Sequence, residues 1–480
     1  MFNFLNRVFK LDENKSTVRA ELVAGLTTFF AMCYIVVVNP SQMTGGAHSA
    51  LFNACFVGGI LAAVIATLCM AFIANKPFAL AAGMGLNSFF FVSFILPNIF
   101  SPEAMEHGYQ AGLSIILISG IIFLILSITG ARKFIAKALP EPIKVAVPAG
   151  IGLFIAFIGL QNAGVVVPNQ YTGVAFATFR DGAGKLVPSS IIPVLTALVG
   201  FVLIIVFNNS KVGFLKKGAI ILGILCGTLF YYLLSFIFIK DYWNTFKDLF
   251  TNSNLGTVFG DWAKFGLGGS IKGFKFVFDG ETIGSIFTVI MLVITYCLVD
   301  MFDTLGTLYG TSAQADMLDE NGDPEKLGQA MLSDSIGTVA GALTGTSTVT
   351  TFVESASGVA AGGRTGLTAF TTAILFLVCL FFAPVARVIP SAATAPALMF
   401  VGLLMFKNIL RIDFNDFLFV AASFTTLFMM VVTYSISNGI MIGAIVYVLL
   451  ALFTGRYTKK DIVITVIALL GILRYIFVNM

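Results

Sequence analysis

Long apolar runs separated by short polar loops dominate the hydropathy pattern of the chain. Runs of about twenty apolar residues are long enough to cross a bilayer as helices. The pattern predicts about fourteen spans, two of which are interrupted. The continuous spans are expected at 20–39, 50–73, 112–130, 144–160, 189–208, 217–239, 284–308, 329–345, 366–386, 391–407, 415–434 and 437–454. A last apolar run, 462–478, fits a further span, a re-entrant segment or an interfacial helix.

Two segments at membrane depth are too polar or too rich in glycine for a plain helix. The third span, 77–96, contains a Gly-Met-Gly break followed by the polar Asn87. The tenth, within the stretch Gly345 to Gly366, carries Glu354 between hydroxyl side chains. Irregular backbone survives in a membrane only where protein buries it or where it lines a watery cavity. An ionisable side chain there marks a functional site, although a water-exposed loop is the simpler alternative.

The two halves of the chain repeat one another. The broken third span lies seven spans before the broken tenth, and spans five and twelve share an internal Pro-Ala, at Pro148 and Pro396. Seven is an odd number, so the second copy is inserted upside down. Inverted repeats with matched broken segments predict a secondary transporter whose site lies at the repeat interface, near the midplane.

The amino-acid composition also indicates a helical protein with several membrane spans. The chain is 58% hydrophobic and 11% charged, whereas a soluble domain averages about 25% charged residues. The segment 241–283 carries both tryptophans and mixed charges, which predicts an interfacial connector. The net charge of +4 comes from loops and indicates no nucleic-acid partner. The six cysteines lie in apolar segments without paired spacing, so we expect no disulfide, metal or cofactor.

Basic residues set the expected orientation. Lys and Arg gather in cytoplasmic loops, and here they follow the even-numbered spans. They are Arg132, Lys133, Lys137, Lys144, Lys211, Lys216, Lys217, Lys407, Arg411, Arg456, Lys459 and Lys460. The parity places the N-terminus in the cytoplasm of a multi-pass protein of the cell membrane.

Four acids fall within predicted spans: Asp300, Asp303, Asp334 and Glu354. Asp300 and Asp303 are three residues apart and share a helix face, which Thr304 and Thr307 also make polar. Burial favours the neutral form of a carboxyl group, so these acids are candidate proton carriers. Asp300 and Asp334 could instead have structural roles. Asn87 could likewise serve only to join neighbouring helices by hydrogen bonds. The acids favour a neutral heterocycle or a cation over an anion.

Four motifs resemble the adenine/guanine/hypoxanthine permeases, the AzgA-like branch of the nucleobase transporters. They are GMGLN at 83–87, DMFDTLGT at 300–307, TGTSTVTTFVESASGVAAGGRTGLTA at 344–369 and TYSISNGI at 433–440. The resemblance implies an all-α, seven-plus-seven inverted-repeat fold in which a core domain moves against a gate domain. The core would comprise 20–130 and 284–388, the gate 140–240 and 389–480, with the connector 241–283 between them.

The resemblance also implies uptake of a purine base coupled to a proton. Asn87, Asp303 and Glu354 would contact the base, with Asp300, Thr307 and Ser355 close by. Glu354, Asp303 or Asp300 would carry the proton. The family resemblance further suggests a homodimer formed through the gate domain.

Other functions fit parts of the pattern. A transporter of xanthine or uracil, or one coupled to sodium, would share the fold. A cation-selective channel or facilitator could use the acids as a ring. No Ser/His pair, HExxH motif or aspartyl-protease-like pair is apparent, so we do not expect an enzyme.

Overall fold

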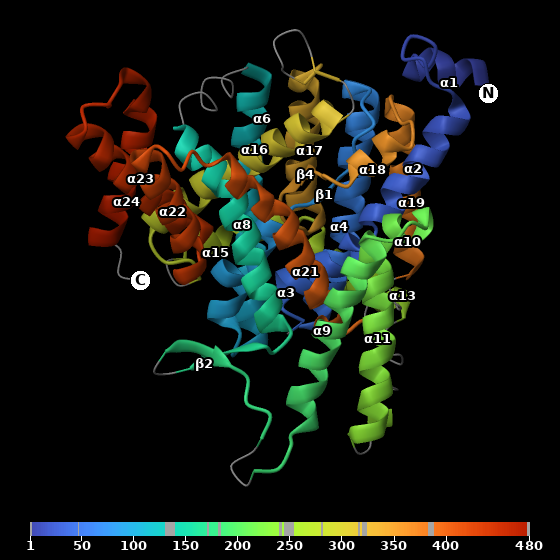
Figure 1. Cartoon of the computed structure of the whole chain (residues 1–480), viewed down its shortest axis with the longest axis horizontal. Coiled ribbons are helices and arrows are strands. Elements are labelled where there is room, and N and C mark those ends of the chain that lie inside the picture. The colour runs from blue at the N-terminus through green and yellow to red at the C-terminus, as the bar shows by residue number, and fades with distance from the viewer. Residues whose placement is uncertain are drawn as a thin grey trace.

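The computed structural model describes residues 2–46, 48–129, 140–169, 172–180, 184–239, 242–243, 254–279, 282–314, 317–318, 324–382 and 388–477. Over these residues the chain is mostly helical (Figure 1). Eight of the described helices are long and apolar enough to cross a membrane, and four shorter apolar helices accompany them. The polytopic all-α fold expected from the sequence is therefore confirmed.

The first half of the chain contains these elements: α1 (Phe2–Phe9), α2 (Val18–Met32), α3 (Ile35–Thr44), α4 (Ser49–Cys69), β1 (Leu80–Ala82), α5 (Met84–Phe90), α6 (Pro102–Thr129), α8 (Glu141–Asn162), β2 (Val166–Asn169), β3 (Gly173–Phe176), α9 (Pro188–Asn208), α10 (Gly213–Lys217) and α11 (Ala219–Phe238). The second half contains α13 (Leu255–Asp261), α14 (Gly269–Lys272), α15 (Phe274–Val277), α16 (Ile286–Gln314), α17 (Leu327–Thr344), β4 (Val349–Thr351), α18 (Ser355–Ala360), α19 (Gly366–Val378), α21 (Ser391–Phe406), α22 (Phe417–Val432), α23 (Ile436–Phe453) and α24 (Ile462–Phe477).

The helices pack in two groups. In the first, which we call the core group (α2–α6 and α16–α19), α4 packs on α17 and α19, and α2 packs on α19. In the second, the gate group (α8–α11 and α21–α23), α8 packs on α21 and α22, and α9 packs on α11. Each group therefore combines helices from both halves of the chain. Small residues allow the closest approaches: a Cβ on Gly58 of α4 would lie 2.3 Å from the carbonyl oxygen of Thr344.

The third and tenth spans are broken, as predicted, and they meet. β1 pairs antiparallel with β4, with Ala81 opposite Thr350. Strand β1 leads into α5 and β4 leads into α18. The pairing satisfies backbone N–H and C=O groups that a broken helix would leave exposed to lipid.

Two predicted spans differ from the structure. The first, expected as one run over 20–39, is interrupted at Cys33 and Tyr34 and continues past Pro40 to Thr44. Pro40 lies inside α3 and has no N–H to donate to the carbonyl of Val36, so the helix lacks one backbone hydrogen bond there. The fourth, expected from residue 112, begins at Pro102. Its first turns carry polar residues, so hydropathy does not identify them as part of a membrane-spanning helix.

The connector is only partly described, because 244–253 lie outside the described residues, as do Arg132, Lys133 and Lys137 of a predicted basic loop. Its described part packs on core helices: the indole N–H of Trp262 donates to the carbonyl of Thr344 at 2.7 Å. The final apolar run forms α24, which packs against α23.

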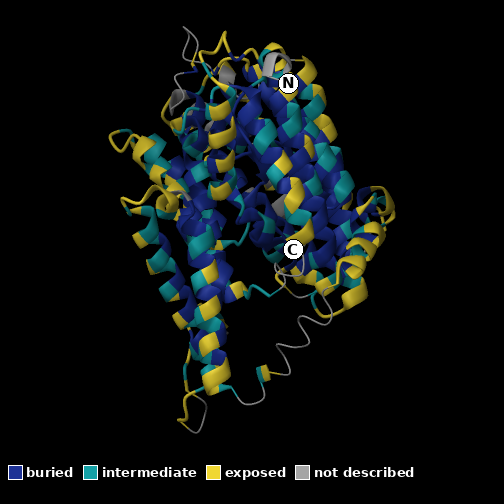
Figure 2. Cartoon of the chain, turned by 90° about the vertical axis from the view of Figure 1, so that its right-hand side faces the viewer, coloured by how far each residue is buried: buried dark blue, intermediate teal, exposed yellow. Residues whose placement is uncertain are grey.

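Exposed residues lie mainly on the outer faces of the helices (Figure 2). On α9 the exposed side chains are apolar and recur at helical spacing, as Leu195, Leu198, Val202 and Val206 show. An apolar face of this kind suits contact with lipid tails.

Candidate substrate site

Glu354 lies directly before α18, where the tenth span is broken, and its side chain is half-buried. The hydroxyl of Tyr34 donates to its Oε1 atom at 2.6 Å. Ser357 donates to the backbone carbonyl of Glu354 through both its N–H, at 2.9 Å, and its hydroxyl, at 2.7 Å. The backbone at Glu354 is therefore fixed locally, and the carboxylate is fixed from the first span.

Asp303 lies on α16, and its side chain is also half-buried. Helix α16 packs against α18 and β4, which brings Asp303 close enough to Glu354 for the two carboxylates to interact electrostatically. These are the two predicted acids that retain exposure. Together they offer hydrogen-bond acceptors to a ligand and repel anions.

Asp300 and Asp334 form a deeper pair. Asp300 is 1% exposed and Asp334 is fully buried. Thr338 donates to Oδ2 of Asp300 at 2.8 Å, and Thr304 donates to Oδ2 of Asp334 at 2.5 Å. The Oδ1 atom of each carboxylate has no hydrogen-bond partner among the described residues. Of the two α16 aspartates, Asp303 is thus the more accessible and Asp300 belongs to the buried pair.

Asn87 is fully buried, and both polar atoms of its amide are hydrogen-bonded. It donates to Oδ1 of Asn39 at 2.9 Å and accepts a hydrogen bond from the hydroxyl of Ser347. Asn39 in turn donates to Thr346 at 3.1 Å. In this conformation Asn87 therefore links the first, third and tenth spans. Such a helix-joining role was one of the two alternatives considered from the sequence.

The two remaining predicted site residues are buried as well. The Ser355 hydroxyl accepts a hydrogen bond from the N–H of Ala79 at 3.0 Å, which joins the broken segments next to their strand pair. Thr307 is 7% exposed and lies one turn after Asp303 on α16. Its backbone carbonyl accepts a hydrogen bond from the hydroxyl of Thr311 at 2.7 Å.

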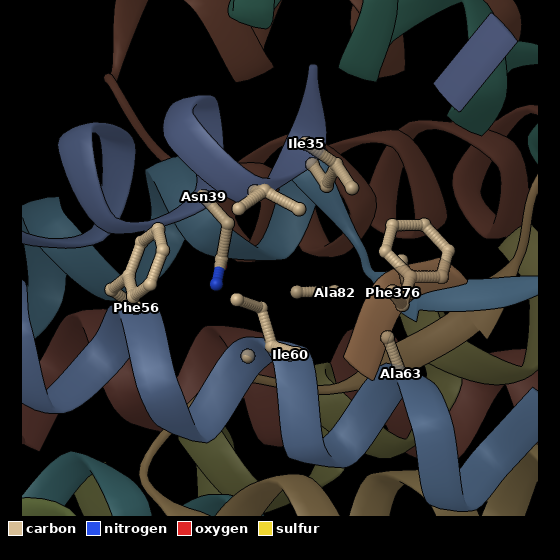
Figure 3. Close-up of a pocket in the computed structure, with 10 residues that line it drawn as sticks. Ile35, Asn39, Phe56, Ile60, Ala63, Ala82 and Phe376 are labelled. Carbon is tan, nitrogen blue, oxygen red and sulfur yellow. The ribbon is translucent and has the colours of Figure 1, made fainter. Parts of the chain in front are cut away.

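A small cavity lies beside this polar cluster, between α3, α4, β1 and α19. Asn39 directs its amide nitrogen toward it, opposite Ile60 and Ala82 (Figure 3). Its volume of about 10 Å³ is room for roughly one water molecule, whereas ligand pockets measure roughly 300–1,000 Å³. The cavity cannot hold a heterocyclic base in this conformation.

Sequence reasoning did not single out Tyr34, which contributes to the site from the interruption in the first span. Tyr34 is fully buried and lies between two helices that both carry apolar sequence. The only signal in the sequence was a tyrosine in the middle of an apolar span. A buried phenol usually finds a hydrogen-bond partner.

Two broken spans that meet around a group of acids are typical of membrane transporters with the inverted-repeat fold. The profile of the Permease family matches residues 19–442, and the chain belongs to this family. It is a multi-pass membrane protein.

Similar proteins support the assignment along the whole chain. The guanine/hypoxanthine permease PbuG of Bacillus subtilis is 36% identical over 98% of this chain and 99% of its own length. The adenine permease AdeQ of Escherichia coli is 34% identical over 99% of this chain and 97% of its own. The transmembrane domain of the cyanobacterial bicarbonate transporter BicA aligns with a TM-score of 0.58 at 13% identity, covering 88% of this chain and 97% of that domain. The last similarity concerns the fold alone.

Proposed function

We propose that this permease imports purine nucleobases, namely adenine, guanine or hypoxanthine, by proton symport with alternating access. The observation that carries the proposal is the pair of half-buried acids, Asp303 and Glu354, in a chain that resembles purine permeases over nearly its full length. Purine rings carry N–H groups that donate to carboxylate oxygens. Ionised carboxylates accept hydrogen bonds and do not donate them, so the pair selects such donors.

The coupling proton is assigned to the deeper acids. Asp300 and Asp334 interact electrostatically with each other and with Asp303, which is also an acid. Two unpaired negative charges inside a membrane protein would carry a large desolvation cost and repel each other. A proton shared between them removes one charge. Its release toward the cytoplasm would recharge the pair and make the core group favour its outward orientation.

Alternating access would move the core group against the gate group. The two groups touch where α5 meets α8: a Cβ on Gly85 would lie 2.5 Å from Cγ2 of Ile151. The site acids and the buried pair all belong to the core group, so they would travel together with the base. The N-terminus would face the cytoplasm of the cell membrane, and a homodimer through the gate group remains a prediction.

The test is uptake of labelled adenine, guanine and hypoxanthine in cells that lack their own purine permeases, with and without a protonophore. We expect accumulation against a gradient that the protonophore abolishes and that replacing sodium leaves intact. Glu354→Gln should reduce uptake at least about tenfold, because a hydrogen bond to a charged group typically contributes that much or more. Glu103→Gln, which changes an exposed acid, is the matched control and should transport normally.

The outcomes separate the parts of the proposal. If the base equilibrates without accumulating, a facilitator replaces the symporter. If sodium is required, the coupling ion is wrong. If protein shown to reach the membrane takes up no purine, the substrate assignment fails, and labelled xanthine and uracil are the next substrates to measure.

A further inference from the structure

The first span brings a phenol to the site. α2 ends at Met32 and α3 begins at Ile35, so Tyr34 lies at the interruption between them. Its side chain is fully buried. Its hydroxyl donates to Oε1 of Glu354 at 2.6 Å, across 320 positions of the sequence. The interruption of the first span therefore reaches the interruption of the tenth.

We propose that Tyr34 is a positioning residue for the base: by holding Oε1 of Glu354, it fixes the direction in which Oε2 is presented to a ring N–H. The inference rests on the proposed function. A glutamate side chain has several rotatable bonds, and fixing them when the base arrives would cost affinity. The phenol fixes them beforehand. Hydrogen bonds to ionised groups are strong enough for this purpose.

The bond is not required to build the surrounding structure. Ser357 already fixes the backbone at Glu354, and the half-buried carboxylate would otherwise be free to turn toward water. Tyr296 on α16 provides a comparison. It is equally buried, yet its hydroxyl has no hydrogen-bond partner among the described residues. The core therefore accommodates a tyrosine ring without such a bond, and the Tyr34 hydroxyl acts on Glu354 in particular.

Both partners belong to the core group, because α3 and α18 pack with helices of that group. A movement of the core group against the gate group would leave their distance unchanged. The presented oxygen would thus keep its direction while access to the site changes from one side to the other. Preorganisation of this kind raises affinity without a new contact to the ligand.

The experiment measures both binding and transport with the full-length protein. Equilibrium binding of labelled adenine and hypoxanthine is measured on purified protein, and KM and maximal uptake rate are measured in cells and corrected for surface level. Tyr34→Phe retains the ring and removes the hydroxyl. We expect Kd and KM to rise about tenfold, the effect of losing one hydrogen bond to a charged group, with the maximal rate within about twofold. Tyr296→Phe, the matched control, should change neither.

A double-mutant cycle tests whether Tyr34 acts through Glu354. Glu354→Asp keeps the charge but withdraws the carboxylate from the phenol, so it should also weaken binding. The double variant should lose less than the product of the two single losses, because residues in contact are not independent. Independent, multiplicative losses would overturn the proposal. If Tyr34→Phe does not fold, Tyr34→Leu, which also lacks the hydroxyl, takes its place in the cycle, and multiplicative losses would overturn the proposal there as well.

The proposed function and this inference fail in different ways. If the wild-type protein binds neither base, the proposed function fails, and the role of Tyr34 fails with it. If the wild-type protein binds a base and Tyr34→Phe binds it equally well, the role of Tyr34 alone is refuted.

Discussion

Glu21 is a buried carboxylate whose replacement should destabilise the core group. It lies on α2 and is fully buried. Its Oε2 atom accepts from the hydroxyl of Thr368 at 2.5 Å, the N–H of Thr368 at 3.2 Å and the N–H of Thr365 at 3.3 Å, while Oε1 accepts from the N–H of Arg364 at 3.0 Å and the hydroxyl of Ser16 at 2.6 Å. The carboxylate thus accepts hydrogen bonds from backbone N–H groups at the start of α19, where a helix leaves such groups without an intrahelical partner; the N–H of Thr368 also donates to the carbonyl of Thr365 at 3.2 Å.

The magnitude for Glu21→Gln follows from these donors. The new amide replaces one oxygen by a donor, so at least one backbone N–H loses its acceptor whichever way the amide points: that of Arg364 at the Oε1 position or that of Thr365 at the Oε2 position. Each buried donor left unpaired costs about 1–3 kcal/mol, and losing a charge at a helix N-terminus costs about 0.3–1 kcal/mol more. Rotation of a hydroxyl recovers part of this, so we expect a loss of about 2 kcal/mol.

Thermal unfolding of the purified protein in detergent is the assay. One kcal/mol shifts the midpoint by about 2–4 °C in domains of 150–250 residues and by less in longer chains, so we expect a fall of about 2–4 °C. Glu13→Gln is the control, since Glu13 is exposed and forms only a surface ion pair with Lys10, which contributes little. A midpoint for Glu21→Gln equal to that of the wild type would refute the reasoning.

Two further predictions concern transport, beside those already given for Glu354 and Tyr34. Gly85→Ala should slow uptake at least several-fold, because its Cβ would clash with Ile151 and disfavour the present contact between α5 and α8. Adding Ile151→Ala should restore the uptake rate in the double variant. A double variant that stays slow would contradict the steric explanation. Asp334→Asn should abolish accumulation while exchange of labelled for unlabelled base persists, since the amide can still accept from Thr304 but cannot release a proton. If the variant still accumulates the base and the protonophore still abolishes this accumulation, another residue carries the proton.

The spans were predictable because they depend on local composition. Twenty apolar residues specify a membrane helix whatever its neighbours are. The two main breaks were also predictable, since glycines and polar residues within apolar sequence point to irregular backbone. The break at Cys33 and Tyr34 was not, because neither residue disrupts a helix on its own. It arises where Tyr34 reaches Glu354, a partner that lies far away in the sequence.

For the site residues too, local sequence identified the candidates, whereas tertiary packing decided their surroundings. Sequence identified Asp300, Asp303 and Glu354 as acids at membrane depth, but the spacing of three residues could not separate the two aspartates. Their environments separate them: Asp303 retains exposure, whereas Asp300 is covered by α17 and bonded to Thr338. Asn87 was expected to contact the ligand, which stays a prediction; in this structure its amide bonds Asn39 and Ser347. Burial of a polar group depends on tertiary packing, which periodicity does not encode.

The first span connects these observations. α3 carries Asn39, which accepts from Asn87 of the third span and donates to Thr346 beside the tenth, and Tyr34 directly before α3 bonds Glu354. Three interrupted spans therefore form one hydrogen-bonded unit, and none of these bonds crosses to the gate group. A base held by this unit would be carried by a rigid body, while the sparse contacts of α5 and α16 with α8 change around it. Under the proposed function, this division would account for the buried polar residues of the core group, since hydrogen bonds would fix the geometry of the unit that binds the base while its apolar contacts with the gate group change.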